Sequence, residues 1–194
     1  EHFKSIGLPL DEILANSDLY PRSDKNPLAF CKDIDREGDI RILANVEDNE
    51  RWMEILLHEG GHTVYNKYID PELPFLIRAP AHTFTTEAIA MLFGRLSRNA
   101  AWMRDMLGLP DEDAHHLAEI TGKYTRFQQL IFAHWTMVMY DFERELYRDP
   151  DQDLNTLWWD LVEKYQLLTR PRGRNGPDWA AKLHFSLAPC YYHN

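Results

Sequence analysis

The stretch ILLHEGGHTVYNKY, residues 55–68, decides the fold of this 194-residue chain, because its pattern predicts a long amphipathic helix that carries two histidines. One broad side of this helix collects residues at helical spacing, namely Trp52, Ile55, Leu56, Glu59, His62 and Thr63. We predict that the helix runs from Glu47 to about Ile69 and ends before Pro71, since proline cannot continue a helix.

The same stretch contains the pattern HExxH, formed by His58, Glu59 and His62. Residues four apart lie on one face of a helix, so both imidazoles can bind a single tetrahedral zinc ion. Glu59 lies beside them as a non-ligand and can take a proton from a zinc-bound water. The competing interpretation is an ordinary amphipathic helix with two structural histidines.

Two adjacent glycines, Gly60 and Gly61, favour the functional interpretation. Each glycine inside a helix costs roughly 1 kcal/mol relative to alanine. Sequences break a local rule of this kind mostly at functional sites. We expect the glycines to let another backbone approach the helix closely, either a substrate strand or the edge of a hairpin.

A catalytic zinc ion needs a third protein ligand and keeps one position for water. Glu87 is the first candidate, because it comes 25 residues after His62 at the start of the next predicted helix. An acid there also stabilises the helix dipole, which is its alternative role. His82, in the preceding loop, is the second candidate. We expect one zinc ion per chain.

The rest of the chain is predicted to be mostly helical, with one small β-hairpin next to the HExxH helix. The turn Asp35-Arg36-Glu37-Gly38 separates two short strands and places glycine where a positive φ is needed. The predicted strands cover 28–34 and 39–46, and the predicted helices cover 10–19, 83–98 with Thr83 or Thr85 as N-cap, 99–108, 111–148, 153–168 and a final piece from 178. We expect a single domain over residues 1–194.

The charge balance excludes a general nucleic-acid binder. The chain has 21 Lys and Arg against 31 Asp and Glu, a net charge of -10, whereas a phosphate backbone requires a basic surface. No segment is long and apolar enough to span a bilayer, and none is typical of a signal peptide. We therefore expect a soluble chain. Because it begins at Glu1, we also expect it to be a piece of a larger protein.

These motifs resemble the peptidyl-dipeptidase A (angiotensin-converting enzyme) family of gluzincin metallopeptidases. The matching residues after the HExxH helix are Tyr68, Leu73-Pro74, Arg78, Glu87, Lys182-Leu183-His184 and Pro189-Cys190-Tyr191-Tyr192. The resemblance covers about residues 29–194 and is patchy between 107 and 170. The thimet-oligopeptidase family is a close second match, since it shares the Glu spacing and a C-terminal His with a tyrosine cluster.

The resemblance implies a zinc ion held by His58, His62 and Glu87, with Glu59 as the base. It further implies that His184 hydrogen-bonds the substrate and that Lys182, with Tyr191 beside it, pairs with the C-terminal carboxylate of a peptide. A tyrosine hydroxyl, from Tyr192 or from just beyond the chain end, would stabilise the oxyanion. Without the resemblance, the favoured roles of these late residues are a solvated lysine, a core histidine and packing aromatics.

The sequence departs from that family at two positions. Met91 stands where the family has an Asp that supports a zinc-binding histidine, so either another group orients the imidazole or the site is altered. Asn194 stands where the second tyrosine falls in ungapped register with His184. Both departures affect side chains that, in that family, orient a zinc-binding histidine or belong to the C-terminal tyrosine cluster.

The sequence therefore predicts a mostly α, helical zincin-type domain that is part of the catalytic region of a larger metallopeptidase. Its expected activity is zinc-dependent hydrolysis that releases dipeptides from the C-terminus of oligopeptides, with Glu59 as the base. The alternatives are a non-catalytic zinc- or peptide-binding domain and an endo-acting oligopeptidase. We expect this piece alone to have little activity, because a peptide groove in such folds lies between two helical halves.

Overall fold

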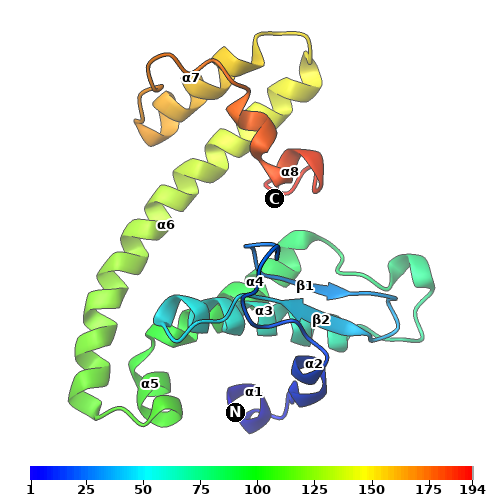
Figure 1. The fold of residues 1–194 in the computed structure, drawn as a ribbon, viewed down its shortest axis with the longest axis vertical. Helices are drawn as coiled ribbons and strands as arrows, with labels where there is room; N and C mark the ends of the chain where they lie inside the picture. The colour runs from blue at the N-terminus through cyan, green and yellow to red at the C-terminus, as the bar shows by residue number, and fades with distance from the viewer. Residues whose placement is uncertain (194) are drawn as a thin grey trace. The chain divides into compact units, whose positions relative to one another are not determined.

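The computed structural model describes residues 1–193 and divides into two compact units, Glu1–Thr121 and Gly122–Asn194 (Figure 1). The described residues are mostly helical with one two-stranded sheet, which confirms the predicted fold class. The longest helix, α6 (Asp111–Arg148), has the predicted bounds and crosses the boundary between the units. The single-domain organisation stays a prediction.

The first unit combines a hairpin with the two helices that carry the HExxH pattern and Glu87. Its elements before α6 are α1 (His2–Ser5), α2 (Asp11–Ala15), β1 (Phe30–Asp33), β2 (Ile40–Leu43), α3 (Glu50–Lys67), α4 (Thr83–Gly94) and α5 (Ala100–Leu107). Short 3-10 helices cover Phe75–Ile77 and Arg95–Arg98. The predicted helix 83–98 therefore changes to a tighter winding after Gly94.

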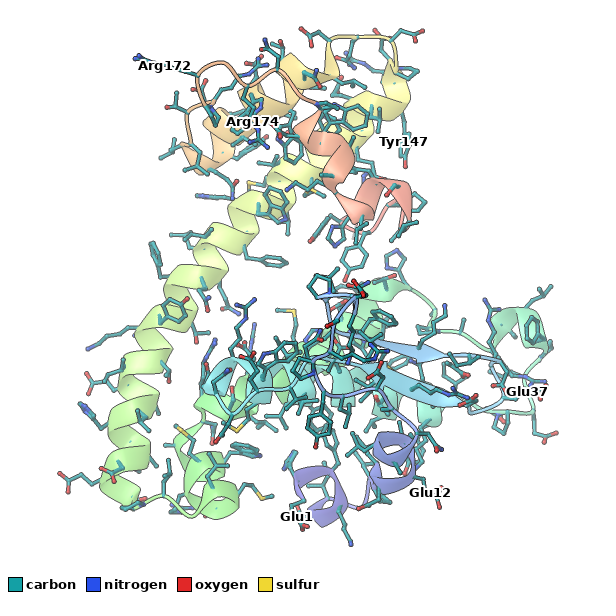
Figure 2. The ribbon with its side chains drawn as sticks, viewed as in Figure 1. Glu1, Glu12, Glu37, Tyr147, Arg172 and Arg174 are labelled. Carbon is teal, nitrogen blue, oxygen red and sulfur yellow. The ribbon has the colours of Figure 1, made fainter. Side chains whose placement is uncertain are left out.

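The hairpin forms because alternate residues of β2 are apolar and pack toward α3. β1 and β2 are antiparallel, with Cys31 opposite Ile42. The side chains of Ile40 and Ile42 are only 2% and 1% exposed. Gly38 has φ 106° in the connecting turn, as predicted, and Glu37 is exposed beside it (Figure 2). Both strands are shorter than predicted, because the paired register covers only four residues of each.

Side chains at their N-termini hold α3 and α4 in place. Asn49 caps α3, since its side chain accepts a backbone N–H of the first turn. His82 caps α4, because its Nδ1 accepts the N–H of Phe84 at 3.0 Å. The predicted cap, Thr83 or Thr85, was wrong. An imidazole nitrogen that carries no proton can accept this hydrogen bond just as a hydroxyl oxygen does.

The second unit is built around the C-terminal half of α6. α7 (Leu154–Gln166), a 3-10 helix at Asp178–Ala181 and α8 (Leu183–Ser186) follow it. The buried core consists of Val138, Met139, Phe142, Trp158, Leu161 and Val162. Phe142 lies edge-on to Trp158 at a centroid distance of 5.2 Å. The core thus joins α6 to α7 through interlocking aromatic rings.

We expect Phe142→Ala to lower the free energy of unfolding of the second unit by about 3–5 kcal/mol, because the side chain is fully buried and its removal leaves a cavity. Denaturant unfolding followed by tryptophan fluorescence measures this change. Phe127→Ala is the matched control, since Phe127 lies on the same helix and is 60% exposed. Equal effects of the two substitutions would show that burial at Phe142 does not stabilise the unit.

Among the helices of residues 1–193, none is both long and apolar enough to cross a membrane. α6 has sufficient length, with 38 residues, but its first turn is acidic and charged residues recur along it.

Candidate metal centre

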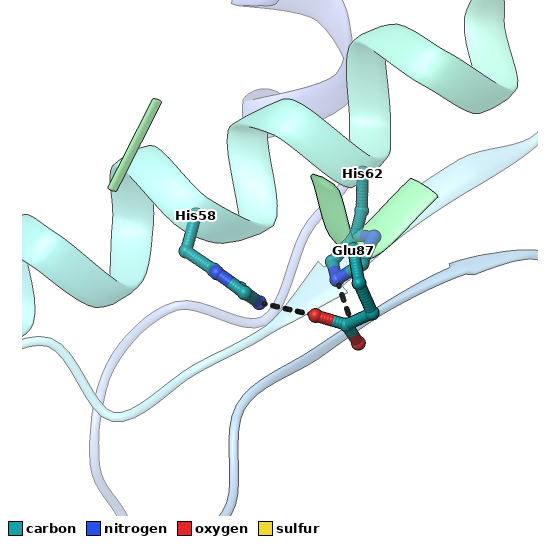
Figure 3. Close-up of side chains that lie close together, drawn as sticks. All are labelled: His58, His62 and Glu87. Carbon is teal, nitrogen blue, oxygen red and sulfur yellow. Dashed lines mark ion pairs between the residues drawn. The ribbon is translucent and has the colours of Figure 1, made fainter. Parts of the chain in front are cut away.

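His58 and His62 lie one turn apart on the same face of α3 (Figure 3). Their ring centroids are 4.8 Å apart, and the rings are nearly perpendicular. The geometry follows directly from the i, i+4 spacing on a regular helix. Burial lowers the pKa of His58, which favours the neutral imidazole that can ligate a metal.

Glu87 comes from the first turns of α4 and faces both imidazoles. Its Oε2 lies 3.5 Å from Nε2 of His58, and its Oε1 lies 3.5 Å from Nε2 of His62 (Figure 3). One ligand atom from each of the three residues lies within 4.8 Å of the others. The structure therefore brings the three predicted ligands together from two helices.

His82, the second candidate for third ligand, lies outside this group. It precedes the first turn of α4, and its Nδ1 accepts the N–H of Phe84. Among residues 1–193, the group of side chains placed to hold a metal ion consists of His58, His62 and Glu87 and does not include His82. The sequence ranking of Glu87 above His82 agrees with this geometry.

Thr86 orients His62. Its buried hydroxyl Oγ1 lies 2.7 Å from Nδ1 of His62. When Nδ1 donates this hydrogen bond, the lone pair of Nε2 is directed toward Glu87, which is the tautomer a metal ion requires. Sequence reasoning left open which group replaces the family's Asp at Met91, and it missed Thr86. The available signal was a hydroxyl immediately before the candidate ligand.

Glu59 follows His58 on α3 and is buried near His62 and Glu87. It is 6% exposed, and its Oε2 has no hydrogen-bond partner among the described residues. Burial raises the pKa of Glu59 to about 7; the nearby charge of His62 opposes this shift and that of Glu87 adds to it. A carboxyl group with such a pKa can accept and release a proton near neutral pH.

The glycines of the HExxH stretch lie at close contacts, but not with the partners we expected. An added Cβ on Gly61 would lie 2.6 Å from Cα of Ala90, and one on Gly60 would lie 2.5 Å from the ring of Phe3. The backbone that approaches Gly61 therefore belongs to α4, and a side chain covers Gly60. The hairpin edge was the wrong partner, because α4 must come close for Glu87 to reach the histidines.

We expect Gly61→Ala to destabilise the first unit by about 1–3 kcal/mol, since its Cβ forces α3 and α4 apart. Gly122→Ala is the control, because that helical glycine has open space around its Cβ position. Alanine there should stabilise the helix by up to about 1 kcal/mol. Urea unfolding of both variants measures the difference. A neutral or stabilising Gly61→Ala would contradict the close contact.

In the second unit, three of the C-terminal residues that the resemblance indicated lie close together. The ring of His184 lies 4.7 Å from that of Tyr191 and 5.0 Å from that of Tyr192, and the two tyrosine rings are 5.0 Å apart. This group, His184 with Tyr191 and Tyr192, is called the ring triad below. Asn194 lies outside the described residues.

Lys182 lies beside aromatic rings in the same unit. Its Nζ is 5.1 Å from the ring centre of Trp135 and 5.7 Å from that of Trp158. Such cation–π contacts orient an ammonium group while leaving it free to donate hydrogen bonds. The zinc-ligand candidates thus belong to the first unit, and Lys182 and the ring triad belong to the second.

Comparison with known proteins relates this fold to peptidases. No family model matches the sequence. The inactive angiotensin-converting enzyme-related protein of Caenorhabditis elegans is 26% identical over 203 residues, which cover 98% of this chain and 22% of that protein. The solved structure of PZ peptidase A with inhibitor 2 has a TM-score of 0.65 and 18% identity, covering 94% of this chain and 32% of that chain. The chain therefore has a peptidase-like fold that contains a His-His-Glu group able to hold a metal ion.

Proposed function

We propose that this chain carries the zinc centre of a metallopeptidase, with one zinc ion held by His58, His62 and Glu87. The convergence of two imidazoles and one carboxylate within 4.8 Å carries the proposal. Two histidines and one glutamate form a donor set that catalytic zinc uses, with one position left open. The buried Oε2 of Glu59, without a hydrogen-bond partner among residues 1–193, adds a proton acceptor beside that set.

Held by His58, His62 and Glu87, a zinc ion would supply the Lewis acidity needed to polarise the scissile carbonyl of a peptide. Glu59 takes the proton of the attacking water and transfers it to the leaving amine. The raised pKa of Glu59, about 7, suits both transfers near neutral pH. Thr86 holds the ring of His62, so that its Nε2 stays directed toward the metal position.

The ring triad and Lys182 are proposed to bind the substrate and to stabilise the oxyanion. His184 and the hydroxyls of Tyr191 and Tyr192 are hydrogen-bond donors that lie close together. Lys182, oriented by two tryptophan rings, is proposed to pair with the C-terminal carboxylate of the peptide. This pairing favours release of dipeptides from the C-terminus.

A non-catalytic zinc- or peptide-binding domain is the second candidate. The name of the C. elegans relative, an inactive enzyme-related protein, favours it. The present chain, however, retains Glu59 in a buried position beside the ligand group. A binding domain has no use for a proton acceptor there, so the peptidase is the better supported function.

The experiment measures zinc content and peptide cleavage of the whole protein together. We expect one zinc ion per chain, loss of cleavage on chelation and recovery with added zinc. Mass spectrometry of a peptide with a free C-terminus and of its C-terminal amide separates the modes of cleavage. A peptidyl-dipeptidase releases dipeptides and cleaves the amidated peptide more slowly than the peptide with a free C-terminus. Equal rates on the two peptides indicate an endo-acting oligopeptidase. Bound zinc without cleavage supports the binding domain.

A further inference from the structure

The two tyrosines of the ring triad occupy the centre of a tight turn. The N–H of His193 donates to the carbonyl oxygen of Cys190 at 3.1 Å, so Tyr191 and Tyr192 are the two central residues. Cys190 has φ 61°, in the left-handed region. A residue with a Cβ is rarely found there and needs surrounding contacts to stay there. Some part of the second unit must therefore hold this turn.

A buried carboxylate contacts both ends of the turn. Glu143, on α6, is 1% exposed, and its Oε1 accepts the backbone N–H of Cys190 at 2.7 Å. Its Oε2 lies 3.2 Å from Nε2 of His193, a close contact that is not a hydrogen bond. The hydroxyl of Tyr147, one helical turn further along α6 (Figure 2), donates to Oε1 at 2.7 Å.

A carboxylate this deeply buried is unfavourable unless other groups satisfy it. Glu143 accepts hydrogen bonds from the N–H of Cys190 and the hydroxyl of Tyr147, and the ring of His193 lies against its second oxygen. The hydrogen bond to Glu143 raises the pKa of Tyr147 to about 12, so this donor stays protonated at neutral pH. Two of the three partners belong to the turn, and the third belongs to the helix.

We propose that Glu143 is a positioning residue, which holds the first and last residues of the turn Cys190–His193 and thereby fixes Tyr191 and Tyr192 against His184. The positional part rests on the contacts within the second unit alone. Its catalytic consequence rests on the proposed function of the ring triad. Glu143 does not touch the reacting groups; it acts through the turn.

Two substitutions of similar size separate positioning from packing. Glu143→Gln keeps an oxygen that accepts the N–H of Cys190 and the hydroxyl of Tyr147. Glu143→Met fills the same space without a strong acceptor. If Glu143 only fills space, methionine is tolerated as well as glutamine. If it holds the turn, glutamine retains the turn and methionine releases it. Glu145→Gln, two residues along the same helix and paired with arginines, is the control.

Nuclear magnetic resonance of the histidine rings measures the position of the turn in the whole protein. The signals of His184 carry the ring-current shift of two tyrosines about 5 Å away, and His184→Gln identifies them. We expect this shift to be retained in Glu143→Gln and Glu145→Gln and lost in Glu143→Met. Peptide cleavage should fall up to about 10²-fold in kcat/KM for Glu143→Met, since a small displacement of positioned groups has effects of that size.

Retention of the His184 shift in a folded Glu143→Met variant would overturn the proposal. If tryptophan fluorescence shows that this variant is unfolded, His193→Leu becomes the deciding variant. It removes the contact between Glu143 and the last residue of the turn. A partial loss of the His184 shift in His193→Leu supports the proposal, and an unchanged His184 shift contradicts it. If the parent protein has no peptidase activity but Glu143→Met still loses the His184 shift, the positioning role stands and the proposed function fails.

Discussion

Replacing Glu59 with glutamine is expected to remove peptide hydrolysis while zinc stays bound. The amide cannot take a proton from the attacking water, and loss of a general base lowers the rate by about 10²–10⁴-fold. The substitution keeps the shape of the side chain, and the three ligands remain in place. Steady-state kcat/KM and bound zinc, measured on the same preparation, check both parts.

Glu54→Gln is the matched control for this substitution. Glu54 lies on the same helix but pairs with Arg98, at 2.6 Å, instead of facing the ligand group. We expect its zinc content and kcat/KM to match the parent protein. Equal cleavage rates for Glu59→Gln and the parent would remove Glu59 from the mechanism. Zinc without cleavage in the parent itself would favour the binding domain.

Replacing His58 with alanine is expected to abolish stable zinc binding, because only two of the three ligands remain. Loss of a group that merely orients a ligand already weakens metal binding by about 10–100-fold, and loss of a ligand itself weakens it further. Glu87→Gln should have a smaller effect, since an amide oxygen still coordinates weakly. Metal analysis after dialysis, together with calorimetric titration, measures the affinities.

His115→Ala is the control for nonspecific effects, because this histidine of the same unit is exposed on α6. It should bind zinc like the parent. Zinc should also raise the melting temperature of the parent but not that of His58→Ala, since a ligand stabilises only the state that binds it. Full zinc retention in His58→Ala would refute the ligand assignment.

The sequence predicted those features that local rules determine. Pro110 and the acids after it marked the start of α6, and the i, i+4 spacing placed His58 and His62 on one face of α3. Glu87 was predicted as the third ligand because a catalytic zinc site needs one and an acid opened the next helix. Each of these inferences required only a few neighbouring residues.

Features that depend on tertiary contacts were missed. Thr86 resembles any helical threonine until α3 and α4 are packed, and only then does its hydroxyl reach His62. Glu143 resembles a solvated helical acid, because its partners Cys190 and His193 come about fifty residues later in the chain. His82 was overlooked as a cap because histidine seldom has that role. Spacing within one segment carries no information about such pairs.

The contact between Gly61 and Ala90 also bears on the kinetics of metal uptake. Because α4 already lies against α3 at this point, the side chains of the ligand group converge before any ion arrives. Under the proposed function, zinc would meet a preorganised site and would not have to drive a folding transition, in contrast to small domains that are unfolded without metal. We therefore expect the speed of loading to be set by diffusion and dehydration of the ion, without a change in the backbone.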